Sequence, residues 1–411
     1  MDSPINKPLT LKCGLKLNNR LVKAAMAECI ADSNGLPTDV HNSIYKQWGA
    51  GGWGMVFTGN VQVDRMYLGD ARDTGFDSAQ EAEFLARWSV LTEGCTKAGT
   101  PAIMQINHPG RQSPVGAGTR GFCEKNISPS AIPLNLGPGL VARFASSFVF
   151  GTPREMSQQD IDSVIKRFVD CSRLAHKAGF QGVELHAAHG YLLAQFLSPK
   201  TNQRSDAYGG SAERRARIVT EIIHGIRDAL PATFCIGIKL NSVDHQSRET
   251  LAACVEQLKL IVAAGVDFVE ISGGTYEDPQ MMQAAVQLQQ EKSARTIARE
   301  AFFLEFASAI RHEIPDVPLL VTGGFRTRTG LAAALADNAC DLVGLGRPAV
   351  VNPSLPNSVI LNEDIPDDQA YFPTKPIRPS WFVKVSGVKS AGSGAESKWY
   401  SKQIQQRGRG Q

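Results

Sequence analysis

Short apolar runs alternate with longer amphipathic stretches along most of this chain. The short runs are rich in β-branched residues, which is typical of strands. There are eight of them, at residues 20–26, 54–60, 101–107, 182–187, 234–241, 268–273, 318–324 and 342–348. The amphipathic stretches follow the helical period and lie at residues 78–98, 157–178, 211–229, 249–264, 296–312 and 328–338. The pattern therefore predicts a repeated strand–helix unit.

Local signals mark the ends of several predicted helices. Ser157, with Asp160 three residues later, is close to a capping box, and Ser211 precedes Glu213 and an arginine-rich first turn. Three stretches end in Ala-Gly, and glycine fits the left-handed position that follows a helix. These glycines are Gly99, Gly179 and Gly265.

Eight strand–helix units within about 350 residues predict a closed barrel rather than an open doubly wound sheet. We expect an α/β fold in which residues 1–361 form a single (β/α)8 TIM barrel. Residues 107–156, after the third strand, are too long for a plain loop, so we expect them to form a capping insertion over the carboxyl-terminal mouth. Residues 362–411 are expected to form a C-terminal extension that is partly flexible. Its end, 398–411, is predicted as a short helix that docks on the barrel or on a partner subunit.

The bulk composition is that of an ordinary globular protein. The 411 residues are 43% hydrophobic with a net charge of +3, which gives no general charge excess for nucleic-acid binding. No run resembles a membrane span, and the first residues lack the apolar region of a signal peptide. The eight cysteines are scattered without a Cys-x-x-Cys pair, which favours reduced thiols over disulfides, zinc or iron–sulfur sites. We therefore expect a cytoplasmic protein that binds neither nucleic acid nor membrane.

The barrel prediction directs attention to the ends of the strands. In this fold the residues that do chemistry lie at strand carboxyl ends or just after them. Unusual residues at those positions are Gln105, His186, Lys239, the pair Gly323-Gly324 and the pair Gly346-Arg347. Their shared location predicts one site at the barrel mouth.

Two imidazoles and a phenol stand where the fourth strand gives way to a helix, in FQGVELHAAHGYLLAQFLSP. His186 ends the apolar run, His189 follows three residues later and Tyr191 two after that. The residues alone leave three interpretations open: a bound metal, a ligand that needs several hydrogen-bond donors, or histidines that only pack. The spacing lacks the glutamate of the His-Glu-x-x-His zinc motif, and no third ligand is obvious.

One glycine-rich segment fits a different pattern. GAGTRG, residues 116–121, matches G-x-G-x-x-G, but no predicted strand precedes it and no predicted helix follows. The dinucleotide-binding fingerprint requires that strand–turn–helix context, so we do not assign it here.

Residues 186–218, HAAHGYLLAQFLSPKTNQRSDAYGGSAERRARI, resemble the Old Yellow Enzyme family of FMN-dependent ene-reductases. The resemblance continues through NRLVKAAM, QINHPGR, IGIKLNS, VTGGFRT and LVGLGRP, each at a predicted strand end and in the family's order. It implies a single (β/α)8 barrel with non-covalent FMN at its mouth and NAD(P)H as the co-substrate that reduces the flavin. The implied substrate is a small molecule of the enone or enal type, and a homodimer is one option for the assembly.

The resemblance also assigns cofactor contacts. A flavin phosphate needs backbone donors and a cation. The residues that would supply them, after the last two strands, are Gly323, Gly324, Gly346 and Arg347. Gln105 would meet the pyrimidine edge of the flavin. Lys239, where many relatives carry Arg, would face the N1–O2 edge; the alternative is a buried salt bridge, with Glu184 as a candidate partner.

The ends of the first two strands would line the flavin ring. The matching residues are Ala24, Ala25, Met26 and Ala27 in the first strand and Thr58, Gly59 and Asn60 in the second. Relatives usually carry Thr or Cys at the position of Ala27, where the hydroxyl or thiol tunes the flavin potential. This chain lacks that group, so the resemblance does not extend to the tuning.

By the same resemblance, His186 and His189 hold the carbonyl or nitro oxygen of the substrate and stabilise the charge that forms on it as hydride arrives. Tyr191 gives the proton to the α-carbon on the opposite face. The implied function is reduction of activated C=C bonds by an NAD(P)H-dependent flavin oxidoreductase. Two alternatives stay open. One is an FMN-containing biosynthetic relative that catalyses a redox-neutral isomerisation, and the other is a non-catalytic flavin-binding barrel.

Overall fold

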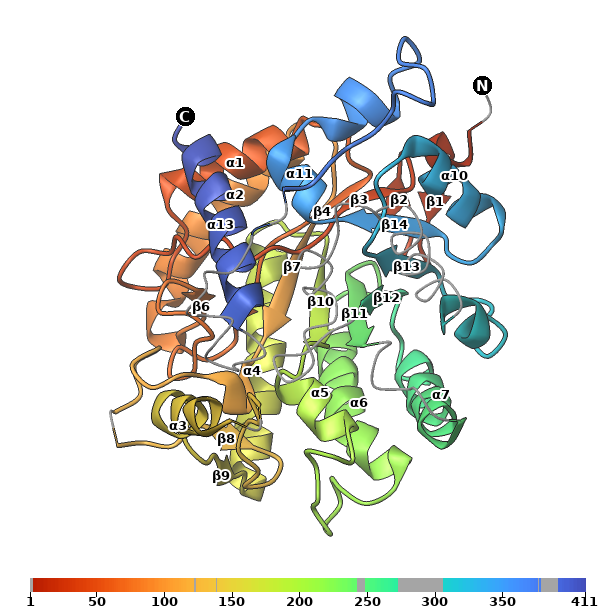
Figure 1. The fold of residues 1–411 in the computed structure, drawn as a ribbon. Coiled ribbons are helices and arrows are strands. Elements are labelled where there is room, and N and C mark those ends of the chain that lie inside the picture. Colours follow the sequence, from red (N-terminus) through yellow and green to blue (C-terminus); the bar gives the residue numbers. More distant parts are fainter. Residues whose placement is uncertain are drawn as a thin grey trace.

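Eight parallel strands close into a barrel in this computed structural model, which describes residues 3–121, 123–137, 139–241, 248–272, 306–375, 377 and 391–411 (Figure 1). The barrel strands are β3 (Leu21–Lys23), β4 (Met55–Phe57), β7 (Ala102–Asn107), β10 (Gly182–Ala187), β11 (Cys235–Asn241), β12 (Phe268–Ser272), β13 (Leu319–Thr322) and β14 (Leu342–Leu345). Each pairs with the next in that order, and β14 pairs with β3 to close the ring. Every predicted run contains one strand, so the predicted (β/α)8 barrel is confirmed.

The amino-terminal end of the barrel is filled by apolar side chains. The rings of Phe57 and Phe268 stack inside it with centroids 5.8 Å apart. Gly237 makes room for them, because a Cβ there would lie 1.9 Å from the Phe268 ring. The hairpin of β1 (Leu9–Thr10) and β2 (Lys16–Leu17) adds Leu11 and Leu17 to the same cluster and so covers this end.

Helices form the outer layer. They are α1 (Asp39–Gly49), α2 (Glu81–Thr96), α4 (Gln158–Lys177), α6 (Ala212–Ala229), α7 (Arg248–Ala263) and α10 (Arg328–Ala336). Five match predicted helices, while α1 was not among those predicted. Residues 306–311 are helical, and the rest of the predicted helix at 296–312 lies outside the described residues. The shorter elements are η1 (Pro4–Asn6), η2 (Ser78–Gln80), α5 (Leu192–Leu197), α11 (Arg347–Val351), η4 (Pro356–Ile360), β5 (Val61–Gln62) and β6 (Thr74–Gly75).

The predicted helix ends are observed. Ser157 and Asp160 form a capping box at the start of α4, and the Ser211 hydroxyl accepts a hydrogen bond from the backbone of Arg214 at the start of α6. The three predicted helix-ending glycines adopt positive φ, at 84° for Gly99, 92° for Gly179 and 109° for Gly265.

The insertion after β7 packs beside the carboxyl ends of β7 and β10 (Figure 1). It contains η3 (Gly110–Gln112), β8 (Ile127–Ser128), α3 (Leu140–Val149) and β9 (Arg154–Glu155). Its first residues contact the segment after β10, since the Gln112 amide donates to His189 O at 2.8 Å and Leu192 N donates to His108 O at 2.9 Å. Residues 116–121 form turns and no strand or helix, as their flanking sequence predicts.

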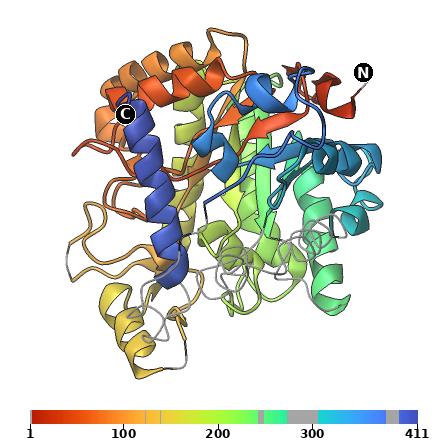
Figure 2. The ribbon, with the colours of Figure 1, turned by 45° about the horizontal axis from the view of Figure 1, so that its top comes forward.

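The C-terminal helix α13 (Ala391–Gly408) docks on the barrel of its own chain, against α1 and α11 (Figure 2). It begins at Ala391, before the start of the helix predicted over residues 398–411. The Ser401 hydroxyl donates to Ala27 O at 2.7 Å, and the Gln405 amide donates to Cys29 O at 3.3 Å. None of the described helices combines the length and apolarity that crossing a membrane requires.

Candidate functional site

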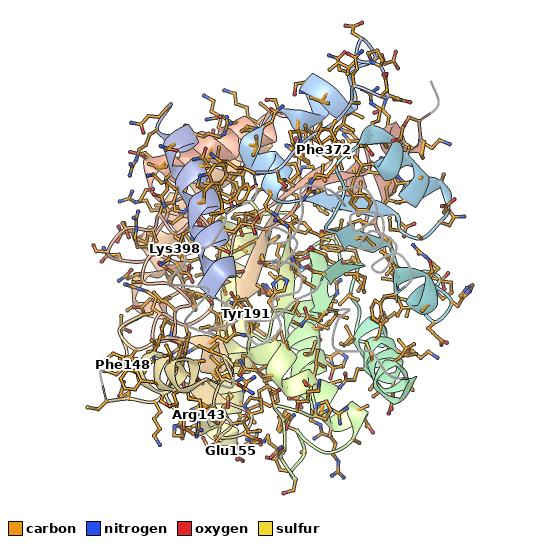
Figure 3. The ribbon with its side chains drawn as sticks, viewed as in Figure 1. Arg143, Phe148, Glu155, Tyr191, Phe372 and Lys398 are labelled. Atoms are coloured by element: carbon orange, nitrogen blue, oxygen red, sulfur yellow. The ribbon has the colours of Figure 1, made fainter. Side chains whose placement is uncertain are left out.

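At the carboxyl ends of the barrel strands lie several residues that are half-buried. The strands themselves are buried, whereas the residues that follow them become partly exposed. The predicted site residues in this ring are Ala25, Met26, Ala27, Asn60, His189, Gly323, Gly346 and Arg347. Figure 3 shows Tyr191 beside the ends of β7 and β10. The predicted residues therefore meet at one mouth.

The turn after β10 aims both histidines at this mouth. Ala188 N donates to His186 Nδ1 at 3.3 Å, and His189 N donates to Asn241 Oδ1 at 3.1 Å. His189 adopts a positive φ of 56°, a conformation that costs energy for a side chain of its size and is found at functional turns. The two imidazole rings lie 4.9 Å apart and nearly perpendicular, at 72°.

Hydrogen bonds define the tautomers of the two rings. Because His186 Nδ1 accepts from the backbone, its proton lies on Nε2, which is 3.2 Å from His189 Nδ1. His189 Nε2 then carries the other proton and lies 3.2 Å from Ser272 Oγ. Burial, with the charge of Lys239 acting in the same direction, lowers the pKa of His189 to about 3. Burial, followed by the nearby His189 and Lys239, lowers the pKa of His186 well below its ordinary value. Both rings are therefore neutral at neutral pH.

Tyr191 stands against the first histidine. Its ring is perpendicular to that of His186, at 89° with centroids 4.8 Å apart, and only 8% of the residue is exposed. Tyr191 also precedes the first residue of α5, so the helix fixes its position. Of the three residues singled out from sequence, His186 thus contacts both of the others.

A buried polar layer lies below the histidines. The Gln105 amide donates to Glu184 Oε2 at 2.6 Å, and Lys239 Nζ lies 2.8 Å from Glu270 Oε1. The salt bridge considered for Lys239 is therefore present, but its partner is Glu270 and not Glu184. Glu270 shares the inward parity of Phe268, a signal that sequence reasoning did not use.

The two buried carboxyls, those of Glu184 and Glu270, differ in protonation. Burial, followed by the charge of Glu270, raises the pKa of Glu184 well above its ordinary value. Burial acts in the same direction on Glu270, but Lys239 outweighs it and the pKa of Glu270 is lowered. Glu184 is therefore protonated and Glu270 is ionised beside Lys239.

The ends of β13, β14 and β3 form the opposite side of the mouth. Gly323 and Gly324 have φ of 136° and 80°, a backbone conformation that residues with a side chain rarely adopt. Gly346 lies against Met26, since a Cβ at Gly346 would be 2.9 Å from the Met26 sulfur. Arg347 is paired with Glu396 of α13, with 2.6 Å between Nη1 and Oε1. Glu396 was missed because its segment carries no helical pattern.

A second buried cation lies behind the β3–β4 corner. Lys23 Nζ donates to Phe57 O at 2.8 Å and lies 4.0 Å from the Trp48 ring centroid. Gly59 N donates to Glu28 Oε1 at 2.8 Å, and a Cβ at Gly59 would lie 2.0 Å from Glu28 Oε2. Lys23 and Glu28 point away from the mouth and hold the turns that line it.

Comparisons with known proteins identify the chain. The sequence profile of the NADH:flavin oxidoreductase / NADH oxidase family matches residues 4–366. This chain belongs to that family. It is therefore an Old Yellow Enzyme relative, an oxidoreductase that uses FMN with NAD(P)H as its co-substrate.

Individual relatives agree with this assignment. An NADH-dependent flavin oxidoreductase, iliE, of Hypocrea jecorina (strain QM6a) is 47% identical over 382 residues, which cover 93% of this chain and 95% of the relative. The NADH-dependent flavin oxidoreductase iccE of Talaromyces variabilis is 47% identical over 411 residues, with 98% of both chains covered. A third, iliE of Neonectria sp. (strain DH2), is 48% identical over 398 residues, which cover 95% of this chain and 52% of the relative. The chain thus spans about half the length of that relative.

Solved structures share the fold. Morphinone reductase superposes with a TM-score of 0.68 at 22% identity, covering 87% of this chain and 89% of that chain. The Old Yellow Enzyme homologue from Zymomonas mobilis gives a TM-score of 0.69 at 20% identity, covering 94% and 99%. Both matches support the barrel described above.

The residues at the mouth fit FMN by their chemistry. An arginine and two glycines of positive φ lie on one side, and an amide and a lysine lie on the other. Ala27 supplies no side-chain hydrogen bond, as the sequence indicates.

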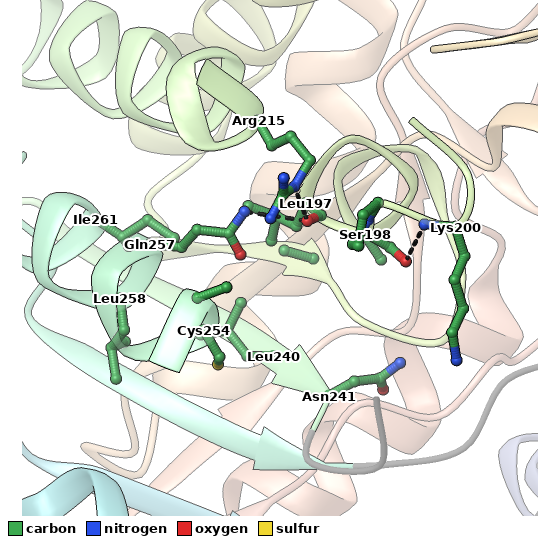
Figure 4. A pocket seen from close by; sticks show the side chains of 14 residues that line it. Leu197, Ser198, Lys200, Arg215, Leu240, Asn241, Cys254, Gln257, Leu258 and Ile261 are labelled. Atoms are coloured by element: carbon green, nitrogen blue, oxygen red, sulfur yellow. Dashed lines mark hydrogen bonds between the residues drawn. The ribbon is translucent and has the colours of Figure 1, made fainter. Parts of the chain in front are cut away.

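A separate cavity of about 260 Å³ lies outside the barrel wall, between β10, β11 and the helices α5 to α7 (Figure 4). Arg215 Nε and Gln257 Nε2 both donate to Leu197 O on one side of it, at 2.9 and 3.0 Å. Ala187 lines this cavity, and it points to the opposite side of β10 from His186. The cavity is therefore distinct from the mouth.

Proposed function

We propose that this enzyme reduces the activated C=C bond of α,β-unsaturated carbonyl compounds, with His186 and His189 binding the substrate oxygen and Tyr191 donating the proton. FMN, when bound, supplies the hydride. The observation that carries the proposal is that the neutral imidazole of His186 contacts both the neutral imidazole of His189 and the buried phenol of Tyr191.

The histidine pair can present two donors to one oxygen. His186 Nε2–H already points toward His189. His189 would donate from Nδ1 in its other tautomer, with Nε2 then accepting from Ser272. A hydroxyl can donate as well as accept, so Ser272 supports either tautomer. Two neutral donors stabilise an enolate-like oxygen without a positive charge that would hold the product.

Tyr191 is the proton donor in this proposal. Its phenol lies on the histidine side of the mouth, and α5 holds it in place. A phenol is a weak acid, but the carbon beside a stabilised oxyanion is basic enough to take its proton. Gln105, Lys239, Gly323, Gly324, Gly346 and Arg347 are proposed to hold the cofactor, together with residues 24–27 and 59–60.

An anaerobic absorption titration tests the function. The purified protein, loaded with FMN, should bleach with NADH or NADPH and recover its absorption when an enone such as cyclohexenone is added. Substrate turnover without NAD(P)H consumption would instead support the isomerase alternative. Protein that stays colourless after saturation with FMN would support neither enzyme.

The double variant His186→Ala/His189→Ala tests the oxygen site. A phenol bound over oxidised flavin gives a long-wavelength charge-transfer band, and this band should disappear in the variant. Loss of the band with normal flavin content supports the proposal, whereas a band of undiminished strength would contradict it.

A further inference from the structure

Two cysteines meet at the amino-terminal end of the barrel, away from the mouth. Cys13 lies in the turn of the β1–β2 hairpin, and Cys235 is the first residue of β11. Their sulfur atoms and a carboxylate oxygen of Asp267 all lie within 4.8 Å of one another. The two thiols are 222 positions apart in sequence and come together only because the hairpin covers the barrel floor.

The neighbouring carboxylate, that of Asp267, already accepts two hydrogen bonds. Asp267 Oδ2 accepts from Arg227 Nη2 at 2.6 Å and from Ile236 N at 2.8 Å. A cation bound by this cluster would therefore stand close to a guanidinium, which disfavours it. The pair of sulfurs remains as the reactive part of the cluster.

The two thiols differ in access and in acidity. Cys13 is half-buried, whereas Cys235 is fully buried. The hydrogen bond from Cys235 lowers the pKa of Cys13, although its partial burial opposes this. Burial raises the pKa of Cys235 well above its ordinary value. Cys13 is thus the more accessible of the two thiols and ionises more readily than Cys235, which stays protonated beside it.

We propose that Cys13 and Cys235 form a redox-reversible disulfide that fastens the β1–β2 hairpin to the floor of the barrel when the protein meets a hydroperoxide. In the first step the Cys13 thiolate attacks an oxygen of hydrogen peroxide, the simplest hydroperoxide, and the O–O bond breaks. The sulfur becomes a sulfenic acid, and the departing hydroxide takes up the proton that Cys13 lost on ionisation and leaves as water. In the second step the Cys235 sulfur attacks the sulfenic sulfur, and its proton leaves with the hydroxyl as a second water. Two thiols are oxidised to one disulfide and one hydroperoxide is reduced.

The turn that carries Cys13 suits this step. Gly14 next to it has a φ of 89° with no atom within 4 Å of where a Cβ would stand, so the turn has room to adjust. A disulfide needs the sulfurs to approach to about 2 Å. Both cysteines are free in the structure, and the proposed bond forms only under oxidation. This inference does not depend on the proposed ene-reductase function.

Intact-mass measurement and peptide mapping test the proposal, on FMN-loaded protein whose thiols are reduced and whose flavin is oxidised at the start. After treatment with a small excess of hydrogen peroxide, we expect a mass loss of two hydrogens and one cross-linked peptide pair that contains Cys13 and Cys235. The reductant dithiothreitol should reverse both changes. Thermal unfolding should shift to higher temperature on oxidation and return on reduction.

Matched variants locate the bond. Cys13→Ser and Cys235→Ala should each abolish the mass loss and the thermal shift, whereas Cys123→Ser, at an exposed cysteine elsewhere, should retain both. The peptide map of the unaltered chain decides the question even if Cys235→Ala fails to fold. Oxygen addition at Cys13 without a cross-link, a cross-link through another cysteine, or stoichiometric Zn²⁺ binding that Cys13→Ser removes would each overturn the proposal.

Discussion

The imidazole of His186, proposed to bind the substrate oxygen, is held by a partner that also fixes its tautomer. The backbone of Ala188 fixes the tautomer of His186, and burial keeps both imidazoles neutral. Because the histidines only bind oxygen in the proposed mechanism, proton delivery falls to Tyr191. The two roles can therefore be separated by experiment.

Tyr191→Phe should slow alkene reduction by about 10²- to 10⁴-fold, the usual contribution of a general acid. Flavin reduction by NAD(P)H should change little, because it needs no proton from the phenol. Stopped-flow absorption measures the two half-reactions separately. Equal losses in both would exclude the proton-donor role.

Replacing each of the two buried carboxyls should have a different effect on the flavin potential. Glu270→Gln removes the charge that balances Lys239, so the reduced, anionic flavin should be stabilised and the potential should rise. A rise of roughly 30 mV corresponds to about 1.4 kcal/mol for two electrons. Glu184→Gln is the matched control, because Glu184 is already neutral and its replacement should shift the potential little. Spectroelectrochemistry that finds equal shifts would contradict the assigned protonation.

At the scale of elements, α13 joins two parts of the cofactor site. Its hydrogen bonds hold residues 27–29 after β3, and its Glu396 pairs with Arg347 after β14. Glu396 is buried, and its ion pair places its negative charge beside the Arg347 guanidinium, which is proposed to bind the flavin phosphate.

Glu396→Gln should tighten FMN binding by about threefold to tenfold, because it removes an anion that opposes the phosphate while an amide oxygen still holds Arg347. Such a change corresponds to about 0.7 to 1.4 kcal/mol. Quenching of FMN fluorescence on binding gives the dissociation constant. Lys398→Gln, an exposed charge change on the same helix, serves as the control. Weaker binding by Glu396→Gln would show that its charge orients Arg347 rather than opposing the phosphate.

The elements that sequence predicts well are those whose burial follows a simple period. All eight strands were found because β-branched runs between turn residues are distinctive. The helix α1 was missed although its buried residues His41, Ile44, Tyr45 and Trp48 follow the helical period, because a histidine and two aromatic residues stand where aliphatic residues usually mark that period. The ion pairs of Lys239 and Arg347 could not be predicted either, since each joins residues brought together only by barrel closure or by α13. The boundary at residue 361 stays a prediction.

For the whole molecule, buried histidines make stability depend on pH. Burial, with the charges of Arg167 and Arg120, lowers the pKa of His108 to about 3, while an unfolded histidine titrates near 6.5. Between these values the unfolded chain binds a proton that the folded chain does not. The stability from His108 is thus complete above pH 6.5 and is lost as the pH falls, by about 2 kcal/mol at pH 5.

His108→Asn should therefore flatten the fall of thermal stability between pH 7 and pH 5. Asparagine keeps an acceptor for Gly110 N and removes the buried Nε2, which has no partner among the described residues. Comparing the two proteins is necessary because Asp73, whose pKa burial raises to about 7, contributes in the opposite direction. Parallel curves for the two proteins would contradict the lowered pKa of His108.

The place of α13 has a consequence for biogenesis. A ribosome synthesises β3 and the turn proposed to line the flavin long before it reaches residue 391. Until α13 has left the exit tunnel, the turn at residues 27–29 lacks the hydrogen bonds from Ser401 and Gln405, and Arg347 lacks its ion pair with Glu396. A nascent barrel without α13 thus lacks these contacts near Arg347, so we expect FMN to bind after α13 has been synthesised rather than before.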